Sequence, residues 1–117
     1  MREFVMMAEF DKGWIGLGLN DDDLLELQYS LVENPKAGDV IKGTRGLRKI
    51  RWHLTGMGKR KGARIIYVDF VICEMIYLIA AYAKNEMDDL TSGMKKEINK
   101  RIATIESELK SGRRTLI

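Results

Sequence analysis

The sequence predicts an α+β domain in which a small antiparallel sheet of about four strands packs against helices. The chain has 117 residues, enough for one domain over residues 1–117 with a modest core between about residues 3 and 110. Apolar residues at helical spacing occur in two separate segments. Three segments typical of strands follow one another between them, and such grouping of strands favours the α+β class.

The first part of the chain is expected to contain one strand and one helix. Residues 3–10 alternate weakly and are expected to form the strand, with a helical turn or loop over Asp11–Gly18. Asn20 is a suitable N-cap, and the three aspartates after it favour the start of a helix. Leucines then recur at helical spacing, and Pro35 disfavours continuation, so the helix is expected at residues 21–33.

Three strands and a final helix are expected in the rest of the chain. The strands are predicted at residues 47–54, 64–71 and 74–83, and short loops between them favour antiparallel pairing. The last of these strands is almost wholly apolar, which is typical of a central strand covered on both faces. A stripe of apolar residues then predicts a helix that is capped by Ser92 and ended by Gly112. We expect the helices to lie on one face of the sheet.

Alternation in the first of these three strands separates apolar from basic side chains. Ile50 and Trp52 fall on one face and are expected in the core, whereas Lys49 and Arg51 point to the other face. Arg64 of the next strand is expected to join the basic side chains. The sequence therefore predicts a positive and partly open sheet surface.

Positive charge is concentrated in the middle of the chain. The net charge is +3, yet no acidic residue lies between Asp39 and Asp69, and this stretch holds nine basic residues. The remainder carries 11 basic and 17 acidic residues, a net charge of −6. The nine are Lys42, Arg45, Arg48, Lys49, Arg51, Lys59, Arg60, Lys61 and Arg64. Such a block indicates a binding site for a polyanion or an acidic partner, and the alternative is a solvated basic hairpin.

Several other classes of function are disfavoured. A single cysteine, Cys73, allows neither an intrachain disulfide nor a thiolate metal cage, and it is expected to be a buried small apolar residue. The aspartate runs are attributed to helix starts, so no metal site and no cofactor are expected. The longest apolar run carries Asp69 and Glu74, and the first residues lack the apolar core of a signal peptide. A cytoplasmic protein without membrane association is therefore expected.

Three segments, in this order and spacing, resemble a known family. They read NPKAGDVIKGTRGLRKIRW, GKRKGARIIYV and YAKNEMDDL. Over about residues 9–110, the chain resembles the HigB-type branch of the bacterial RelE/ParE toxin superfamily. This resemblance implies a RelE-like sheet packed by helices and the toxin role in a type II toxin–antitoxin system. It also implies neutralisation by a cognate antitoxin and cleavage of mRNA on the ribosome.

The resemblance also implies which residues meet the scissile phosphate. Lys49 and Arg51 match the basic strand of the family, Arg64 matches a key arginine, and Lys84 matches a basic position after the last core strand. Asn85 and Thr91 stand where the well-studied RelE branch has an arginine and a tyrosine. The proton donor and acceptor are therefore left open, with Tyr82 or the loop residues Lys59 and Lys61 as candidates.

Metal-free RNA cleavage needs a base for the 2′-hydroxyl, an acid for the leaving oxygen and cations for the charge on phosphorus. His53 is the one histidine in the sequence; a surface position is the favoured interpretation and a general base the alternative. A lysine held among other cations is a further candidate base. Tyr82 is interpreted equally well as a base-stacking residue and as a plain sheet residue.

The remaining basic side chains are expected to bind RNA around the reacting centre. They are Arg45, Arg48, Lys59, Arg60 and Lys61. Two alternatives to an mRNA endoribonuclease stay open. The first is a ParE-like toxin without nuclease activity that acts on DNA gyrase, and the second is an RNA-binding relative without turnover.

Overall fold

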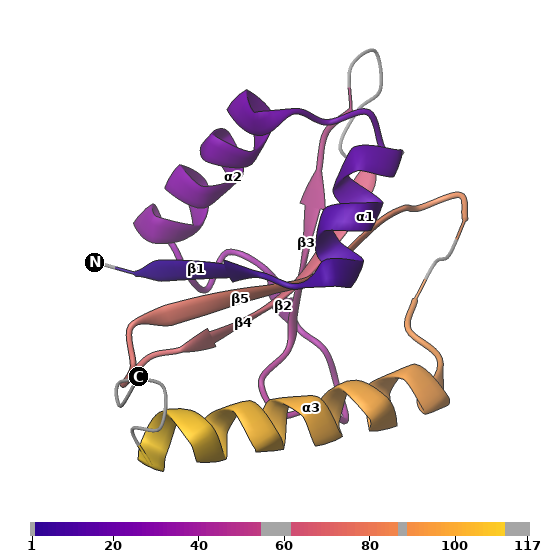
Figure 1. The fold of residues 1–117 in the computed structure, drawn as a ribbon. Helices are drawn as coiled ribbons and strands as arrows, with labels where there is room; N and C mark the ends of the chain where they lie inside the picture. Colours follow the sequence, from indigo (N-terminus) through magenta and orange to yellow (C-terminus); the bar gives the residue numbers. More distant parts are fainter. Residues whose placement is uncertain (1, 55–61, 87–88, 112–117) are drawn as a thin grey trace.

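Five strands and three helices make up the fold of the computed structural model, which describes residues 2–54, 62–86 and 89–111. In chain order they are β1 (Glu3–Met6), α1 (Ala8–Gly16), α2 (Asp21–Glu33), β2 (Asp39–Val40), β3 (Arg48–Trp52), β4 (Ala63–Phe70), β5 (Met75–Ala83) and α3 (Ser92–Ser111) (Figure 1). The predicted α+β class is confirmed.

The strands form one open sheet in the order β1-β5-β4-β3-β2. The β2–β3, β3–β4 and β4–β5 pairs are antiparallel, as predicted, but β1 runs parallel to β5 with Glu3 opposite Met75. The sheet is therefore mixed and has five strands. Sequence analysis did not detect β2, because two residues are too few to show alternation.

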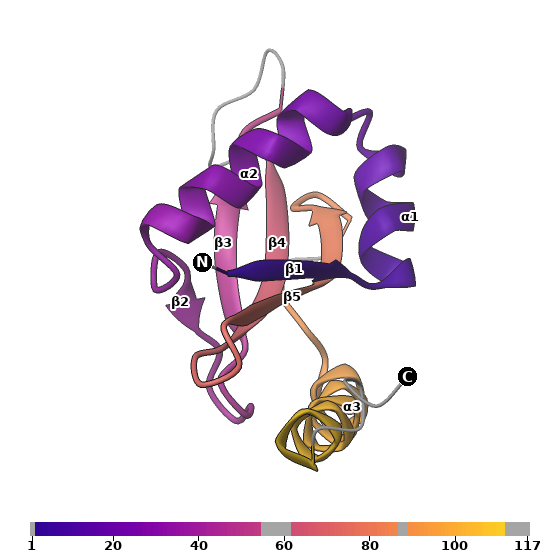
Figure 2. The same cartoon turned by 60° about the vertical axis from the view of Figure 1, so that its left-hand side comes forward.

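Helices cover both faces of the sheet, so the prediction that they lie on one face is wrong. Figure 2 shows α1 and α2 on one side of the strands and α3 on the other. The physical reason lies in β4, which is buried continuously over Ala63–Val68. A strand that is apolar on both faces needs an apolar cover on each. One core lies under α1 and α2, around Phe10 and Leu27, and a second lies under α3, around Ile102.

The N-terminal segment differs from its prediction. The strand ends at Met6 instead of residue 10, and the helical turn or loop expected over Asp11–Gly18 is a helix that already begins at Ala8. Phe10 and Trp14, one helical turn apart, stack with ring centroids 5.3 Å apart and are buried in the first core. Helix α1 is held close to β5 at Gly13, where an added Cβ would overlap the carbonyl group of Ala81.

The ends of α2 and α3 are set by side-chain caps. The prediction of α2 at 21–33 is confirmed, and Asn20 and Asp23 form reciprocal 2.9 Å hydrogen bonds with each other's backbone N–H. The prediction that Ser92 caps α3 is wrong by one residue, because Thr91 Oγ1 accepts the bond from the Met94 N–H at 3.1 Å. Gly112 lies outside the described residues.

The apolar stripe predicted for the last helix is confirmed in α3. Its members pack on the second core and are Met94, Ile98, Ile102, Ile105 and Leu109. Cys73 departs from its prediction: it lies half-buried in the turn between β4 and β5 rather than in the core.

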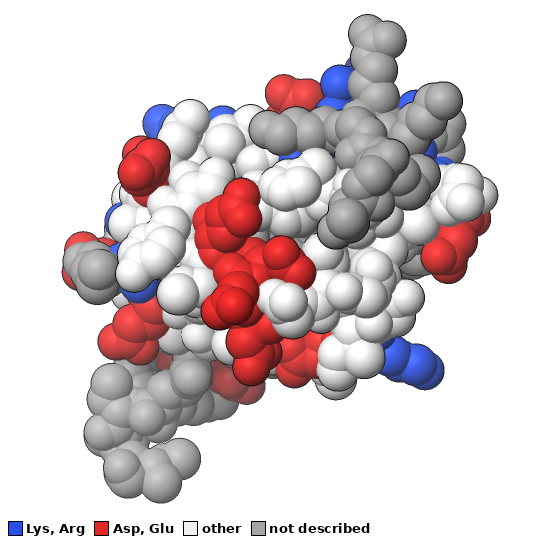
Figure 3. Space-filling view, turned by 90° about the horizontal axis from the view of Figure 1, so that it is seen from above, with Lys and Arg blue, Asp and Glu red and all other residues white. Residues whose placement is uncertain are grey.

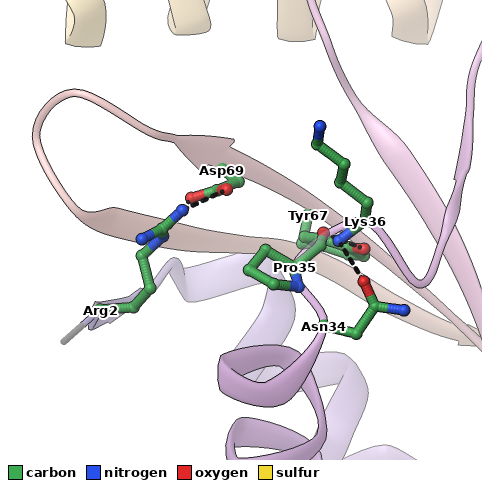
Figure 4. A network of polar contacts seen from close by, with 6 residues as sticks. All are labelled: Arg2, Asn34, Pro35, Lys36, Tyr67 and Asp69. Atoms are coloured by element: carbon green, nitrogen blue, oxygen red, sulfur yellow. Dashed lines mark hydrogen bonds and ion pairs between the residues drawn. The ribbon is translucent and has the colours of Figure 1, made fainter.

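A buried tyrosine attaches the segment after α2 to the sheet. Tyr67 of β4 donates a 2.8 Å hydrogen bond to the Pro35 carbonyl and accepts a 2.9 Å bond from the Gly38 N–H (Figure 4). Burial raises the pKa of Tyr67, so its hydroxyl keeps the proton that it donates. Two positions further along β4, Asp69 forms a bidentate ion pair with Arg2 at 2.7 and 2.9 Å, which fixes the residue before β1 (Figure 4).

Candidate functional site

Four of the five candidate catalytic residues line one open pocket, with a volume of about 760 Å³. They are Lys49, Arg51, Arg64 and Lys84. The described lining also contains two carboxylates, Asp39 and Asp89, and the indole of Trp52. The pocket lies where β3 and β4 meet the end of β5. Its charged side chains come from β2, β3 and β4 and from the connection between β5 and α3.

Strand register places the two arginines side by side. Arg51 of β3 is directly opposite Arg64 of β4, and Arg64 is directly opposite Tyr82 of β5. Directly opposed side chains share one face of the sheet, with Cβ atoms about 5 Å apart. This confirms the alternation predicted for β3, because Ile50 and Trp52 contact the first core on the other face.

Arg64 is the most enclosed of the four cations. Its residue is only 5% exposed, and its Nη1 donates a 3.2 Å hydrogen bond to the Ala63 carbonyl. Arg51 is exposed beside it. Like charges on opposed strand positions destabilise a sheet, and an anion bound between the two guanidinium groups would offset that repulsion. The planar guanidinium fork is suited to holding a phosphate through two parallel hydrogen bonds.

Lys49 lies beside both carboxylates of the pocket. Its Nζ is 3.4 Å from Asp89 Oδ1, and its position in β3 is directly opposite Asp39 of β2. Asp89 Oδ1 also accepts a 2.9 Å hydrogen bond from the Leu90 N–H. This bond, followed by the charge of Lys49, lowers the pKa of Asp89 below its ordinary value. Asp89 is therefore an ionised counter-charge to Lys49.

Lys84 and Tyr82 occupy different environments at the end of β5. Lys84 is exposed in the turn that follows the strand, where its backbone N–H donates a 3.1 Å bond to the Gly62 carbonyl. Tyr82 is 9% exposed and belongs to the core under α3, and the pocket lining does not include it. The sheet face predicted to be positive and partly open is thus covered by α3 along much of its length, and it is open at the pocket.

Two of the predicted RNA-binding residues, Arg45 and Arg48, lie within the described part of the chain. Arg45 pairs with Glu106 of α3 at 3.3 Å, and Arg48 donates a 2.7 Å bond to the Gly38 carbonyl. Neither of these two arginines lines the pocket. Lys59, Arg60 and Lys61 lie outside the described residues. His53 is exposed, with its ring 5.2 Å from that of Trp52, and it does not line the pocket either.

Sequence reasoning missed the two carboxylates of the site. Asp89 was attributed to the start of a helix, and Asp39 marked the boundary of the basic stretch. Carboxylates from distant parts of the chain form ion pairs with residues of the basic stretch. Asp89 pairs with Lys49, and Glu106 pairs with Arg45. Two cations of that stretch are therefore paired with carboxylates from elsewhere in the chain. The one available signal was the pair of adjacent aspartates after the last strand.

The opposite side of the molecule is acidic. Exposed carboxylates on α1 and α2 are Glu9, Asp11, Asp21, Asp22, Glu26 and Glu33. Figure 3 shows acidic side chains gathered on the face that these helices cover. A polyanion is therefore repelled from the face that α1 and α2 cover.

Two further properties concern the described part of the chain. Within it, no three histidine, cysteine or acidic side chains are grouped closely enough to hold a metal ion. None of its helices combines the length and the apolar character needed to cross a bilayer.

The fold and the site define a small α+β protein with a cationic pocket at one end of its sheet. No protein-family model matches the sequence. Among solved structures, the chain is similar to the crystal structure of the isolated E. coli RelE toxin, with a TM-score of 0.49 and 16% sequence identity. The match covers 87% of this chain and 99% of that chain.

Proposed function

We propose that this chain is the toxin of a type II toxin–antitoxin system, of the HigB type, and cleaves mRNA on the ribosome. The observation that carries the proposal is the meeting of Lys49, Arg51, Arg64 and Lys84 in one open pocket. These are the four basic positions that the family resemblance assigns to the scissile phosphate. Side chains up to 35 positions apart in the sequence thus line one pocket, and this supports the proposal.

The proposed reaction is a transesterification without a metal ion. The 2′-oxygen attacks the adjacent phosphorus, and the bond from phosphorus to the 5′-oxygen breaks. The products are a 2′,3′-cyclic phosphate and a 5′-hydroxyl, with one proton removed from the nucleophile and one delivered to the leaving oxygen. Negative charge grows on the phosphoryl oxygens in the transition state, and fixed cations stabilise it.

Arg64 is assigned the role of phosphate clamp, because its burial fixes the guanidinium before the substrate arrives. Arg51 and Lys84 supply the exposed positive charge that meets the RNA backbone. Lys84 also carries protons that it could deliver to the leaving oxygen. The described lining contains no histidine, so accurate positioning of the 2′-hydroxyl by the ribosome is assigned a large share of the catalysis.

The partners follow from this role. They are the ribosome, translated mRNA and a cognate antitoxin, which places the protein in the cytoplasm. RNA is proposed to approach the pocket rather than the face covered by α1 and α2, because the acidic side chains gathered on that face repel phosphate (Figure 3). No cofactor takes part in the proposed reaction.

Controlled expression followed by mapping of mRNA 5′ ends tests the proposal. New ends are expected inside translated frames within minutes, and they are expected to disappear when translation is blocked. Arg64→Ala and Lys84→Ala should abolish the new ends, whereas Arg101→Ala, an exposed arginine of α3 paired with Glu9, should not. Growth arrest with intact mRNA would instead favour action on DNA gyrase, and arrest that survives both pocket substitutions would overturn the assigned site.

A further inference from the structure

The two described carboxylates of the pocket lie close to the same cation. Four cations line the pocket, and both described carboxylates lie beside one of them, Lys49. Asp39 faces Lys49 across the β2–β3 pair, and Asp89 reaches it from the connection between β5 and α3. Lys49 therefore occupies an end of the pocket that already contains anionic groups.

We propose that Asp89 competes with the substrate phosphate for Lys49. Its carboxylate occupies the place of the phosphate at Lys49 until the RNA backbone displaces it. This inference rests on the proposed function, because it assigns the displacing anion to the RNA backbone. Asp89 is accordingly a positioning residue that acts through Lys49. Its effect is to weaken the hold of the empty pocket on RNA and to reserve Lys49 for a phosphate that is already well placed.

The Lys49–Asp89 pair has the geometry of a contact that opens easily. The nitrogen–oxygen distance is 3.4 Å, and the two side chains are 28% and 59% exposed. Ion pairs of such exposure contribute little to stability and are screened by salt. A phosphate bound in the pocket offers Lys49 a second anion, and the Lys49–Asp89 contact that it replaces is exposed.

Asp89 remains near the pocket when it leaves Lys49. Its Oδ1 is also the acceptor of the Leu90 N–H at 2.9 Å, and Leu90 is buried in the core under α3. This anchor holds the carboxylate at the rim. The lowered pKa of Asp89 keeps it ionised at neutral pH, so it is a poor proton acceptor for the 2′-hydroxyl and a persistent counter-charge.

The exchange has a measurable signature in salt dependence. When a phosphate displaces Asp89 from Lys49, the freed carboxylate takes up a cation and cancels one counterion released by the RNA. In Asp89→Asn this compensation is absent, so the slope of log affinity against log salt should steepen by about 0.7 for a single strand. Removing one negative charge about 4 Å from a bound phosphate should also tighten binding about fivefold at low salt.

Fluorescence anisotropy with a short single-stranded 2′-O-methyl RNA measures both quantities, because the blocked 2′-oxygen prevents cleavage. Asp89→Asn keeps a side-chain oxygen for the Leu90 N–H, so the local turn should be preserved. The tighter binding and the steeper slope should vanish in the Lys49→Met background. Asp89→Glu, which keeps the charge, should bind as weakly as the wild type.

A second variant separates competition at Lys49 from general repulsion. Asp39→Asn removes the same charge from the same pocket and should give the smaller gain in affinity. Equal gains from Asp39→Asn and Asp89→Asn, or a gain from Asp89→Asn that persists without Lys49, would overturn the inference. The absence of RNA binding by both the wild type and Asp89→Asn would overturn it as well.

The outcome does not depend on whether the protein cleaves mRNA. Tighter, more salt-dependent binding by Asp89→Asn together with unchanged cellular mRNA would uphold the competitor role and refute the nuclease. Normal cleavage of cellular mRNA with identical binding by wild type and Asp89→Asn would refute the competitor role and leave the nuclease standing.

Discussion

Replacement of Arg64 by glutamine tests the central role of the pocket. Glutamine preserves part of the side-chain volume and a hydrogen-bond donor but removes the charge. Arg64 is 5% exposed and lies opposite Arg51, so the cation is held in place before RNA binds. Loss of one preorganised donor to transition-state charge typically lowers the rate about 100- to 1,000-fold, or about 2.7–4 kcal/mol. We expect a fall of this size in ribosome-dependent cleavage.

The same substitution should change stability far less than activity. Loss of the 3.2 Å hydrogen bond to the Ala63 carbonyl should cost about 1 kcal/mol, and removal of one of two like charges on opposed strand positions should offset part of this cost. Purified ribosomes programmed with a defined mRNA give the cleavage rate, and urea denaturation gives the free energy of unfolding. Arg101→Gln, at an exposed arginine, is the matched control. A cleavage rate of the same order as that of the wild type would refute the reasoning. So would a folded fraction of the variant so small that unfolding alone explains the loss of cleavage.

Three further substitutions test the fold. Gly13→Ala should lower the free energy of unfolding by about 1–3 kcal/mol in urea denaturation, because its Cβ would overlap the backbone of β5. Tyr67→Phe leaves the buried Gly38 N–H without its 2.9 Å acceptor and should cost about 1–3 kcal/mol, also in urea. The hydrogen bond from Arg101 lowers the pKa of Glu9, so this pair stabilises the fold above about pH 4.5 and ceases to do so as the pH falls further. In Glu9→Gln, the free energy of unfolding should therefore fall less steeply as the pH is lowered. The difference from the wild type should be less than about 1 kcal/mol, because the pair is exposed.

Elements with local signals were predicted at or near their observed bounds. Helix α2 was placed at residues 21–33 because its cap, its acidic first turn and its apolar face lie within one segment. The strand with Lys49 and Arg51 was found from alternation, which also assigned these side chains to the face opposite Trp52. The placement of the four pocket cations likewise agrees with the positions that the family resemblance selected.

Elements that depend on distant partners were not predicted. Helix α1 owes its position to contacts with the middle of β5, about 65 residues later in the chain, and to the close approach that Gly13 allows. The parallel pairing of β1 depends on β5, the last strand in chain order, and no feature of residues 3–6 indicates this partner. The position of α3 on the second face follows from the burial of β4 on both sides.

The sequence by itself determined the α+β class, the main helix, three of the strands and the identity of the basic residues, because these depend on neighbours within a few positions. Tertiary structure alone decided which charges meet. It enclosed Arg64, left Tyr82 in the core, paired Arg45 with Glu106 and brought Asp89 to Lys49 across 40 positions of the chain. Electrostatic energy depends on the distance between charges in space and on their exposure to water, and neither quantity can be read from the order of residues in the chain.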